Sequence, residues 1–119
     1  MEVMDECAPL LVDGYKAVFE NHSPDRMVGY VEIHWSVTRF GESRSESIEF
    51  HYRMKKAGKN RFEHMLRFSD ADGYLKLGEG DILRYYFTYW VLPPGDNQGH
   101  DCQTNVKWFA SPAIATGSG

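Results

Sequence analysis

The chain lacks the features that mark several large classes of protein. It has no window of the roughly 18 apolar residues that a membrane-spanning helix requires. Its N-terminal stretch, MEVMDECAPLLVDG, has neither the basic nor the apolar region of a signal peptide. The net charge is −4 with the charges interspersed, whereas nucleic-acid binding requires a basic surface. We therefore expect no membrane and no nucleic acid as partner.

Helical periodicity and catalytic motifs are also missing. No apolar pattern at positions i, i+3, i+4 and i+7 is long enough to predict an α-helix, and residues 2–13 leave room for one helical turn. The motifs H-E-x-x-H and G-x-S-x-G, the Walker loop and the dinucleotide fingerprint do not occur. A glycosidase needs two carboxylates across a cleft, and no spacing among the 17 acidic residues selects a pair. We expect a non-enzyme without a cofactor; a small glycan hydrolase is the less favoured alternative.

Residues of the types that bind metals do not form a complete ligand set. His34 and His51 would be cross-strand neighbours beside Glu32 and Glu49, but a solvated face explains this array better than a metal site. The acidic stretch 70–81 opens like a calcium-binding loop and then lacks a third ligand position and the final glutamate. Ordinary turn chemistry of Asp and Gly explains it better. We expect no bound metal.

Cysteine is scarce, since only Cys7 and Cys102 are present. Each lies in a polar, loop-like setting, DECAP and GHDCQ. This favours a disulfide that ties the terminal strands together in an oxidising compartment, over two unrelated buried thiols. Asn21-His22-Ser23 is an N-glycosylation acceptor sequence and points the same way. A secreted, extracellular protein is therefore predicted.

Aromatic residues and alternating patterns are abundant. Aromatics make up 14% of the chain, which favours strands and stacking sites. Apolar and polar residues alternate in several short runs separated by Gly, Pro and Asp turns, which predicts an all-β protein, an antiparallel β-sandwich. One domain is expected over residues 1–110, and residues 111–119 resemble a flexible tail or linker. The expected strands are 14–20, 28–37, 47–54, 61–68, the long strand that ends the stretch 75–91, and 103–109.

The stretch 75–91, LKLGEGDILRYYFTYWV, organises the rest of the chain. Side chains alternate between the two faces of a strand, so one set should face the core: Leu83, Tyr85, Phe87, Tyr89 and Val91. The other set is Ile82, Arg84, Tyr86, Thr88 and Trp90. An aromatic surface with hydrogen-bonding neighbours suits a flat, polar ligand such as a sugar. A central strand covered on both faces would instead make Tyr86 and Trp90 core residues, and the pattern does not separate the two interpretations.

The predicted site uses both the strand and the loop before it. Trp90 and Tyr86 would stack on a pyranose, where the buried area is worth about 1–3 kcal/mol per ring. Arg84 and Asp70 would orient the sugar through charge-assisted hydrogen bonds, with support from Asp72 and Tyr74. The alternative is a protein-interaction domain that uses the same aromatic face. Two other tryptophans are predicted elsewhere: Trp35 in the core, and Trp108 in the core or at an edge.

Three stretches resemble one known family. LKLGEGDILRYYFTYWV, the preceding RFEHMLRFSDADGYLKLG with Phe68 and Asp70, and DGYKAVFENHS are similar to the N-terminal glucan-binding domain of insect β-1,3-glucan recognition proteins and Gram-negative-binding proteins. The resemblance implies an immunoglobulin-like sandwich and a secreted, non-catalytic carbohydrate-binding module (a lectin of innate immunity) for β-glucan, β-1,3-linked. The polysaccharide is the expected partner, and self-association on the ligand stays open. Two loops depart from the family pattern, at residues 38–46 and 93–97.

Overall fold

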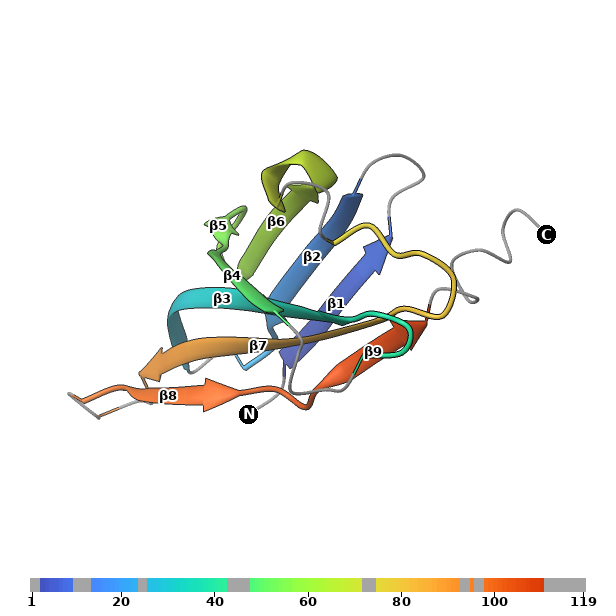
Figure 1. The fold of residues 1–119 in the computed structure, drawn as a ribbon. Helices are drawn as coiled ribbons and strands as arrows, with labels where there is room; N and C mark the ends of the chain where they lie inside the picture. The colour runs from blue at the N-terminus through green and yellow to red at the C-terminus, as the bar shows by residue number, and fades with distance from the viewer. Residues whose placement is uncertain are drawn as a thin grey trace.

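Two antiparallel sheets make up the computed structural model, which describes residues 3–9, 14–23, 26–42, 48–71, 75–92, 95 and 98–110 (Figure 1). The first sheet has the order β1-β2-β6-β5, with strands Val3–Pro9, Gly14–Asn21, Arg61–Arg67 and Lys55–Lys56 respectively. The second has the order β4-β3-β7-β8, with strands Ile48–Arg53, Met27–Thr38, Ile82–Leu92 and His100–Gln103; β9, Lys107–Ala110, also pairs with β7.

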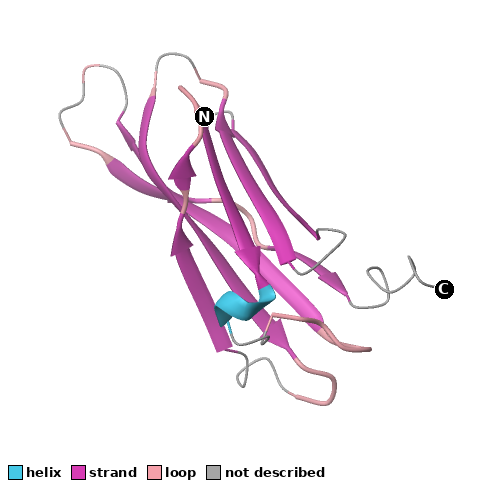
Figure 2. Cartoon of the chain, turned by 90° about the horizontal axis from the view of Figure 1, so that it is seen from above, coloured by secondary structure: helices cyan, strands magenta, loops and turns pink. Residues whose placement is uncertain are grey.

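Strands dominate the described chain, and its one helical element is the short 3₁₀ helix η2, Phe68–Ala71 (Figure 2). No helix in the described part is long and apolar enough to cross a membrane. The predicted all-β class is therefore confirmed, and the two sheets are consistent with a β-sandwich. The five strands predicted between residues 14 and 91 are all present, with ends that differ by at most one residue outside the 75–91 stretch.

The inner faces of the two sheets pack against each other and form the core. Phe19 of β2 in the first sheet contacts Phe87 and Tyr89 of β7 in the second, with ring centroids 5.9 and 4.8 Å apart. Trp35 is fully buried, as predicted, and its ring contacts those of Tyr52 and His64. Complete burial of a large apolar side chain contributes about 1.5–3 kcal/mol. The predicted core face of β7 is also confirmed, because all five of its side chains are buried: Leu83, Tyr85, Phe87, Tyr89 and Val91.

Two parts of the predicted secondary structure are wrong. Residues 3–9 form strand β1 rather than a helical turn, because they pair with β2, with Cys7 opposite Ala17. The predicted strand 103–109 is split into β8 and β9 around Thr104. There the Thr104 N–H donates to the Phe87 carbonyl at 2.9 Å, and the Phe87 N–H donates to the Thr104 hydroxyl at 3.0 Å. The side chain thus replaces one bond of the strand ladder.

The predicted disulfide is also wrong, since Cys7 and Cys102 are both free thiols. Cys7 lies on β1 in the first sheet, where the indole N–H of Trp35 donates to its sulfur at 3.2 Å. Cys102 lies on β8 in the second sheet, opposite Tyr89. The polar flanking residues that suggested loops belong to strands of different sheets, so each thiol meets its own set of neighbours.

The Asn21 amide is part of a turn. Its side chain is 4% exposed, its Nδ2 donates to the Arg26 carbonyl at 2.7 Å, and its Oδ1 accepts from the Ser23 N–H at 3.0 Å. These bonds close the connection from β2 to β3, as expected of Asn in a turn. In this conformation the amide nitrogen that a glycan would need is engaged and buried.

Candidate functional site

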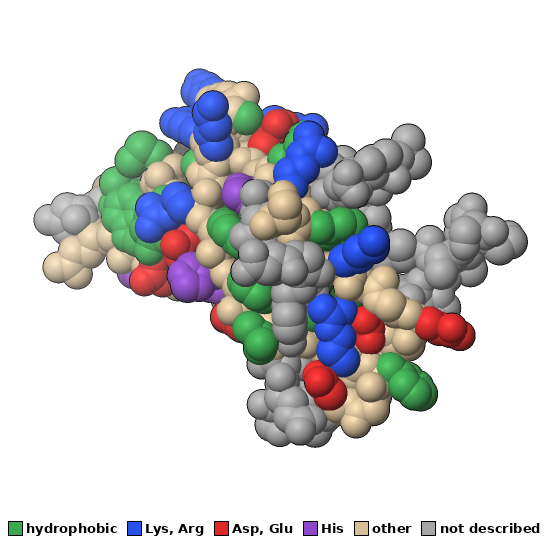
Figure 3. Space-filling model, turned by 45° about the horizontal axis from the view of Figure 1, so that its top comes forward, with side chains coloured by type: hydrophobic (Ala, Val, Ile, Leu, Met, Phe, Trp, Pro, Cys, Tyr) green, Lys and Arg blue, Asp and Glu red, His purple; other side chains and the backbone are tan. Residues whose placement is uncertain are grey.

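The side of the second sheet that points away from the core carries most of the predicted site. We call it the outer face. Strand register and the alternation of burial define its members: Tyr30, Glu32, His34, Ser36 and Thr38 of β3; Glu49, His51 and Arg53 of β4; Ile82, Arg84, Tyr86, Thr88 and Trp90 of β7; Asp101 and Gln103 of β8; and Trp108 of β9. Histidine, acidic and basic side chains lie next to one another on the surface of the molecule (Figure 3).

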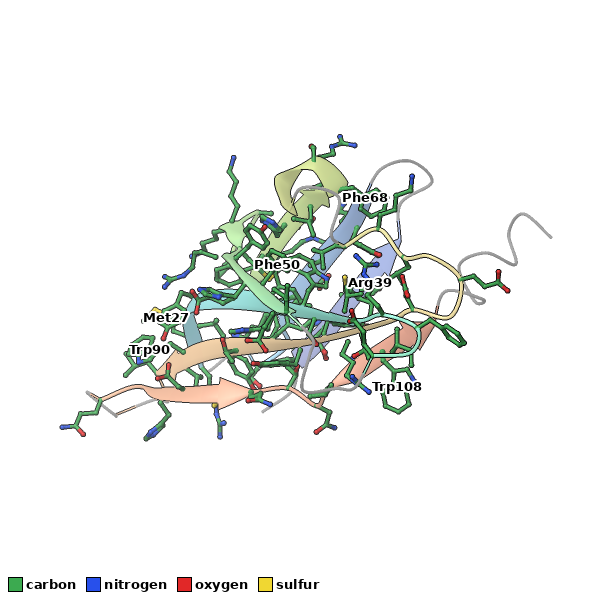
Figure 4. All side chains as sticks on the ribbon, viewed as in Figure 1. Met27, Arg39, Phe50, Phe68, Trp90 and Trp108 are labelled. Carbon is green, nitrogen blue, oxygen red and sulfur yellow. The ribbon has the colours of Figure 1, made fainter. Side chains whose placement is uncertain are left out.

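Arg84, Tyr86 and Trp90 share this face and are each partly exposed, so none of the three is sealed in the core. They do not converge on one point. Six residues separate Arg84 from Trp90, which corresponds to about 20 Å along a strand. Figure 4 shows Trp90 near Met27 at one end of the sheet and Trp108 at the other. The face therefore has a Trp90 end, a centre around Tyr86 and an Arg84 end.

At the Trp90 end, the indole lies low against the sheet. A Cβ atom built on Gly29 of β3 would stand 2.4 Å from its Cε3, and one built on Gly99, before β8, would stand 1.9 Å from its Cε2. The ring thus fills the layer that side chains at both positions would otherwise occupy. Glycine at 29 and 99 is what allows it to lie there. Sequence reasoning did not find this pair, because only the register across three strands brings it together.

Polar groups surround this indole. The Tyr30 hydroxyl donates to Asp101 Oδ1 at 2.7 Å, and this bond crosses β7 at the level of Trp90, since β7 lies between β3 and β8. The same hydrogen bond raises the pKa of Tyr30. The Arg53 guanidinium stacks 4.2 Å above the Tyr30 ring, and its Nε donates to Glu32 at 3.4 Å. Donors and acceptors in fixed positions therefore lie beside an apolar ring.

At the centre of the face, Tyr86 is already engaged. Its ring stacks on His34 with centroids 4.5 Å apart and planes 3° apart, and His34 in turn stacks on His51. The His34 Nε2 contacts the Thr88 hydroxyl at 2.9 Å, and the Tyr86 hydroxyl donates to Glu49 at 3.4 Å. Burial, and then the charge of Glu49, raise the pKa of Tyr86. One face of the Tyr86 ring is thus covered by His34, and its hydroxyl is already bonded to Glu49.

At the Arg84 end, Arg84 lies opposite Trp108 of β9 and donates from Nη1 to the Thr38 hydroxyl at 3.0 Å. Trp108 is 67% exposed, so it occupies an edge rather than the core. In β9 the charged residue faces inward and the tryptophan faces outward, which is the reverse of the usual arrangement. Lys107 takes the inner side because its Nζ reaches the Asp5 carboxylate of β1 at 2.8 Å, which turns Trp108 outward. Nothing local in the sequence reveals this partner.

The predicted loop residues are only partly visible. The backbone of Asp70 belongs to η2, but its side chain is not among those that the structure describes. Asp72 and Tyr74 lie outside the described residues. Within the described residues no cluster of three or more His, Cys, Asp or Glu side chains could hold a metal ion. The stretch 70–81 ends in a structural carboxylate, Asp81, which accepts bonds from the backbone N–H groups of Gly78 and Phe40.

The geometry defines a two-sheet β protein with a mixed aromatic and charged surface on one sheet. No protein-family model matches the chain, and no curated protein matches it. The function must therefore be argued from the outer face itself.

Proposed function

We propose that the outer face is a non-catalytic carbohydrate-binding surface, with β-glucan, and first the β-1,3-linked form, as its ligand. The position of Trp90 is the observation that carries this proposal. The indole lies down over Gly29 and Gly99, partly exposed, on the side of the sheet away from the core. A pyranose ring would stack on it, with a contribution of about 1–3 kcal/mol from the area removed from water.

Hydrogen bonds beside the ring would supply orientation. Asp101 and Glu32 present carboxylates and Arg53 presents a guanidinium, each held by a partner from another strand. Bonds from sugar hydroxyls to such charged groups are about twice as strong as bonds between neutral groups. These three residues take the place of Arg84 in the proposed site at the Trp90 end, since Arg84 lies about 20 Å along the strand.

The strand order supports an immunoglobulin-like module as part of the same proposal. The orders β1-β2-β6-β5 and β4-β3-β7-β8 correspond to the A-B-E-D and C′-C-F-G sheets of that architecture. The resemblance of the stretch 75–91 to insect glucan-binding domains selects β-1,3-glucan as the first ligand to try. Secretion is part of the same proposal and is supported by this resemblance, not by a disulfide.

The direct test is sedimentation of the chain with insoluble β-1,3-glucan, with chitin and cellulose alongside. Trp90→Ala should weaken glucan binding by more than about tenfold, equivalent to about 1.4 kcal/mol. Phe40→Ala is the matched control, because Phe40 is 80% exposed on the loop after β3, at the opposite end of the sheet from Trp90. Circular dichroism must show both variants folded.

A second variant tests the indole position without removing it. Gly29→Ala places a methyl group where Cε3 now lies, so the ring must lift from the sheet and glucan binding should fall. Full glucan binding by folded Trp90→Ala would refute the site. Release of reducing ends from laminarin would show a hydrolase instead. Loss of stability with binding intact would make Trp90 purely structural.

A further inference from the structure

A hollow lies at the Arg84 end of the outer face, far from Trp90. Its volume is about 270 Å³, and its lining residues are Ile82, Arg84, Val106 and Trp108. Trp108 is 67% exposed and Val106 39% exposed, so a large aromatic ring and an aliphatic side chain both meet water here. Exposed apolar surface next to a charged group commonly marks a binding site.

The Arg84 guanidinium is fixed by one hydrogen bond, and no carboxylate among the described residues forms an ion pair with it. Its Nη1 donates to the Thr38 hydroxyl at 3.0 Å, and its direct cross-strand neighbours, Ser36 and Trp108, carry no charge. The described part of the chain places no carboxylate within ion-pair distance of it. Glu49, opposite Ser36 on β4, is directed to the Tyr86 hydroxyl instead. With respect to the part of the chain that the structure describes, four of the five guanidinium N–H groups therefore remain to bind an acceptor from outside.

We infer that this hollow binds one acidic sugar residue, a uronate, with its carboxylate on Arg84 and the apolar face of its ring on Trp108. Arginine pairs with a carboxylate through two parallel hydrogen bonds, which makes the pair strong and directional. The exposed indole supplies the stacking surface that a pyranose ring needs. Charge complementarity therefore selects an acidic ring over a neutral one.

The size of the hollow limits its occupant. Sites for drug-sized ligands measure about 300–1,000 Å³, so a hollow of about 270 Å³ fits a single ring better than a peptide segment. The site would lie on the same face as the proposed glucan surface but at the opposite end. It shares neither Trp90 nor its polar neighbours, so either site can exist without the other.

The test compares an oligoglucuronate with a glucose oligomer of the same linkage and length, each titrated calorimetrically into the full chain. The wild type should bind the acidic oligomer at least about tenfold more tightly. Arg84→Gln should abolish that preference, Arg84→Lys should keep part of it, and Trp108→Ala should weaken acidic binding about tenfold. Met65→Ala, at an exposed position of β6 in the first sheet, should change nothing. All variants are first checked for the wild-type circular dichroism spectrum.

Several outcomes would overturn the inference. Equal affinity for the two oligomers, or a preference that survives in folded Arg84→Gln, would refute a uronate site. Poly-glutamate bound as tightly as oligoglucuronate would make it a site for acidic peptides. If the wild type forms dimers and Trp108→Ala is monomeric, a second copy of the chain covers the hollow. Insoluble β-1,3-glucan binding, measured in parallel, reports on the proposed function separately.

Discussion

At the scale of single residues, Asp81 joins two loops with one carboxylate. It is 6% exposed and accepts hydrogen bonds from the N–H groups of Gly78 at 2.7 Å and Phe40 at 2.9 Å, and from Arg39 Nη1 at 2.8 Å. Burial on its own would raise the pKa of Asp81. The two backbone bonds and Arg39 together outweigh burial, and the pKa is lowered.

We expect Asp81→Ala to lower the free energy of unfolding by about 2–4 kcal/mol, because it leaves two backbone donors and one guanidinium without their acceptor. Since the folded pKa lies below the unfolded value of about 3.9, this stabilisation is present above that value and is lost as the pH falls through the folded pKa. Urea unfolding from neutral pH down to about pH 3 measures both effects.

Asp81→Asn separates charge from shape in this prediction. It keeps one acceptor oxygen, so it should fall between the wild type and Asp81→Ala at neutral pH and lose less stability on acidification. Glu79→Gln, on an exposed residue of the same loop, is the control and should behave like the wild type. An Asp81→Asn variant with the full acid dependence of the wild type would contradict this account.

Cys7 and Cys102 should differ in reactivity. Burial raises the pKa of the Cys7 thiol to about 12, against the opposing effect of the Trp35 hydrogen bond, so almost no thiolate exists at neutral pH. Cys102 is partly exposed. Brief alkylation of the native protein should therefore modify Cys102 first, and alkylation in urea should modify both; peptide mass spectrometry reads the sites. A gain of two hydrogen masses on reduction of the purified protein would instead reveal a disulfide.

At the scale of strands, Thr104 attaches both β8 and β9 to β7. Its hydroxyl takes the Phe87 N–H that a continuous strand would have bonded through its backbone. Thr104→Val keeps the shape of the side chain and removes the acceptor, leaving that N–H unsatisfied. We expect a loss of about 1–2 kcal/mol in the free energy of unfolding, measured by urea denaturation. Thr104→Ser keeps the hydroxyl and should lose less than half as much; equal losses would show that the hydrogen bond is not the cause.

The strands that the sequence predicts well are those with one face in the core. β7 along its whole length and β3 from Tyr30 onward alternate strictly because each buries one face between the sheets, so Trp35 and Phe87 could be assigned to the core from a period of two. β1 could not, because its local pattern is weak and only pairing with β2 makes it a strand. The break at Thr104 depends on Phe87, which lies 17 residues away.

In the candidate site too, the local pattern predicts some features, and contacts between distant parts of the chain set the others. That Arg84, Tyr86 and Trp90 share one face comes directly from their parity. The distances between these three residues, and the identity of their neighbours, could not be predicted from parity. Gly29 and Gly99 meet under Trp90 through cross-strand register, and Trp108 faces outward because of an ion pair far along the chain. Long-range pairing of this kind leaves no trace in a local pattern.

At the scale of the whole molecule, the two outer surfaces differ in kind. On the first sheet, Arg61 bonds Glu63 at 2.6 Å and pairs with Glu20, and Lys16 lies 3.9 Å from Glu63, so these charges largely satisfy one another. The second sheet instead presents two partly or largely exposed tryptophans at its ends, with a fixed guanidinium near each. This asymmetry is the reason to look for ligands on the second sheet.

The core between the sheets should make the protein sensitive to alkali. Burial raises the pKa of Tyr15, Tyr85 and Tyr89 above the ordinary value of about 10. Below that value all three are protonated whether folded or unfolded, so stability does not change. Above it the unfolded chain releases protons that the folded chain keeps, and the free energy of unfolding falls with each further unit of pH. We expect a stability plateau through neutral pH and a steep loss above about pH 10.

This loss should be cooperative. Tyrosinate absorbance should rise together with the loss of circular dichroism, because the buried hydroxyls ionise only when the sheets separate. Tyr15→Phe provides the check. The Tyr15 hydroxyl donates to the Leu75 carbonyl at 2.7 Å, so its removal should lower stability at neutral pH by about 1 kcal/mol. The variant has one buried proton fewer to release, so its stability should fall less steeply above about pH 10. Gradual ionisation of every tyrosine near its ordinary pKa, with the dichroism unchanged, would mean that the rings are not held between two packed sheets.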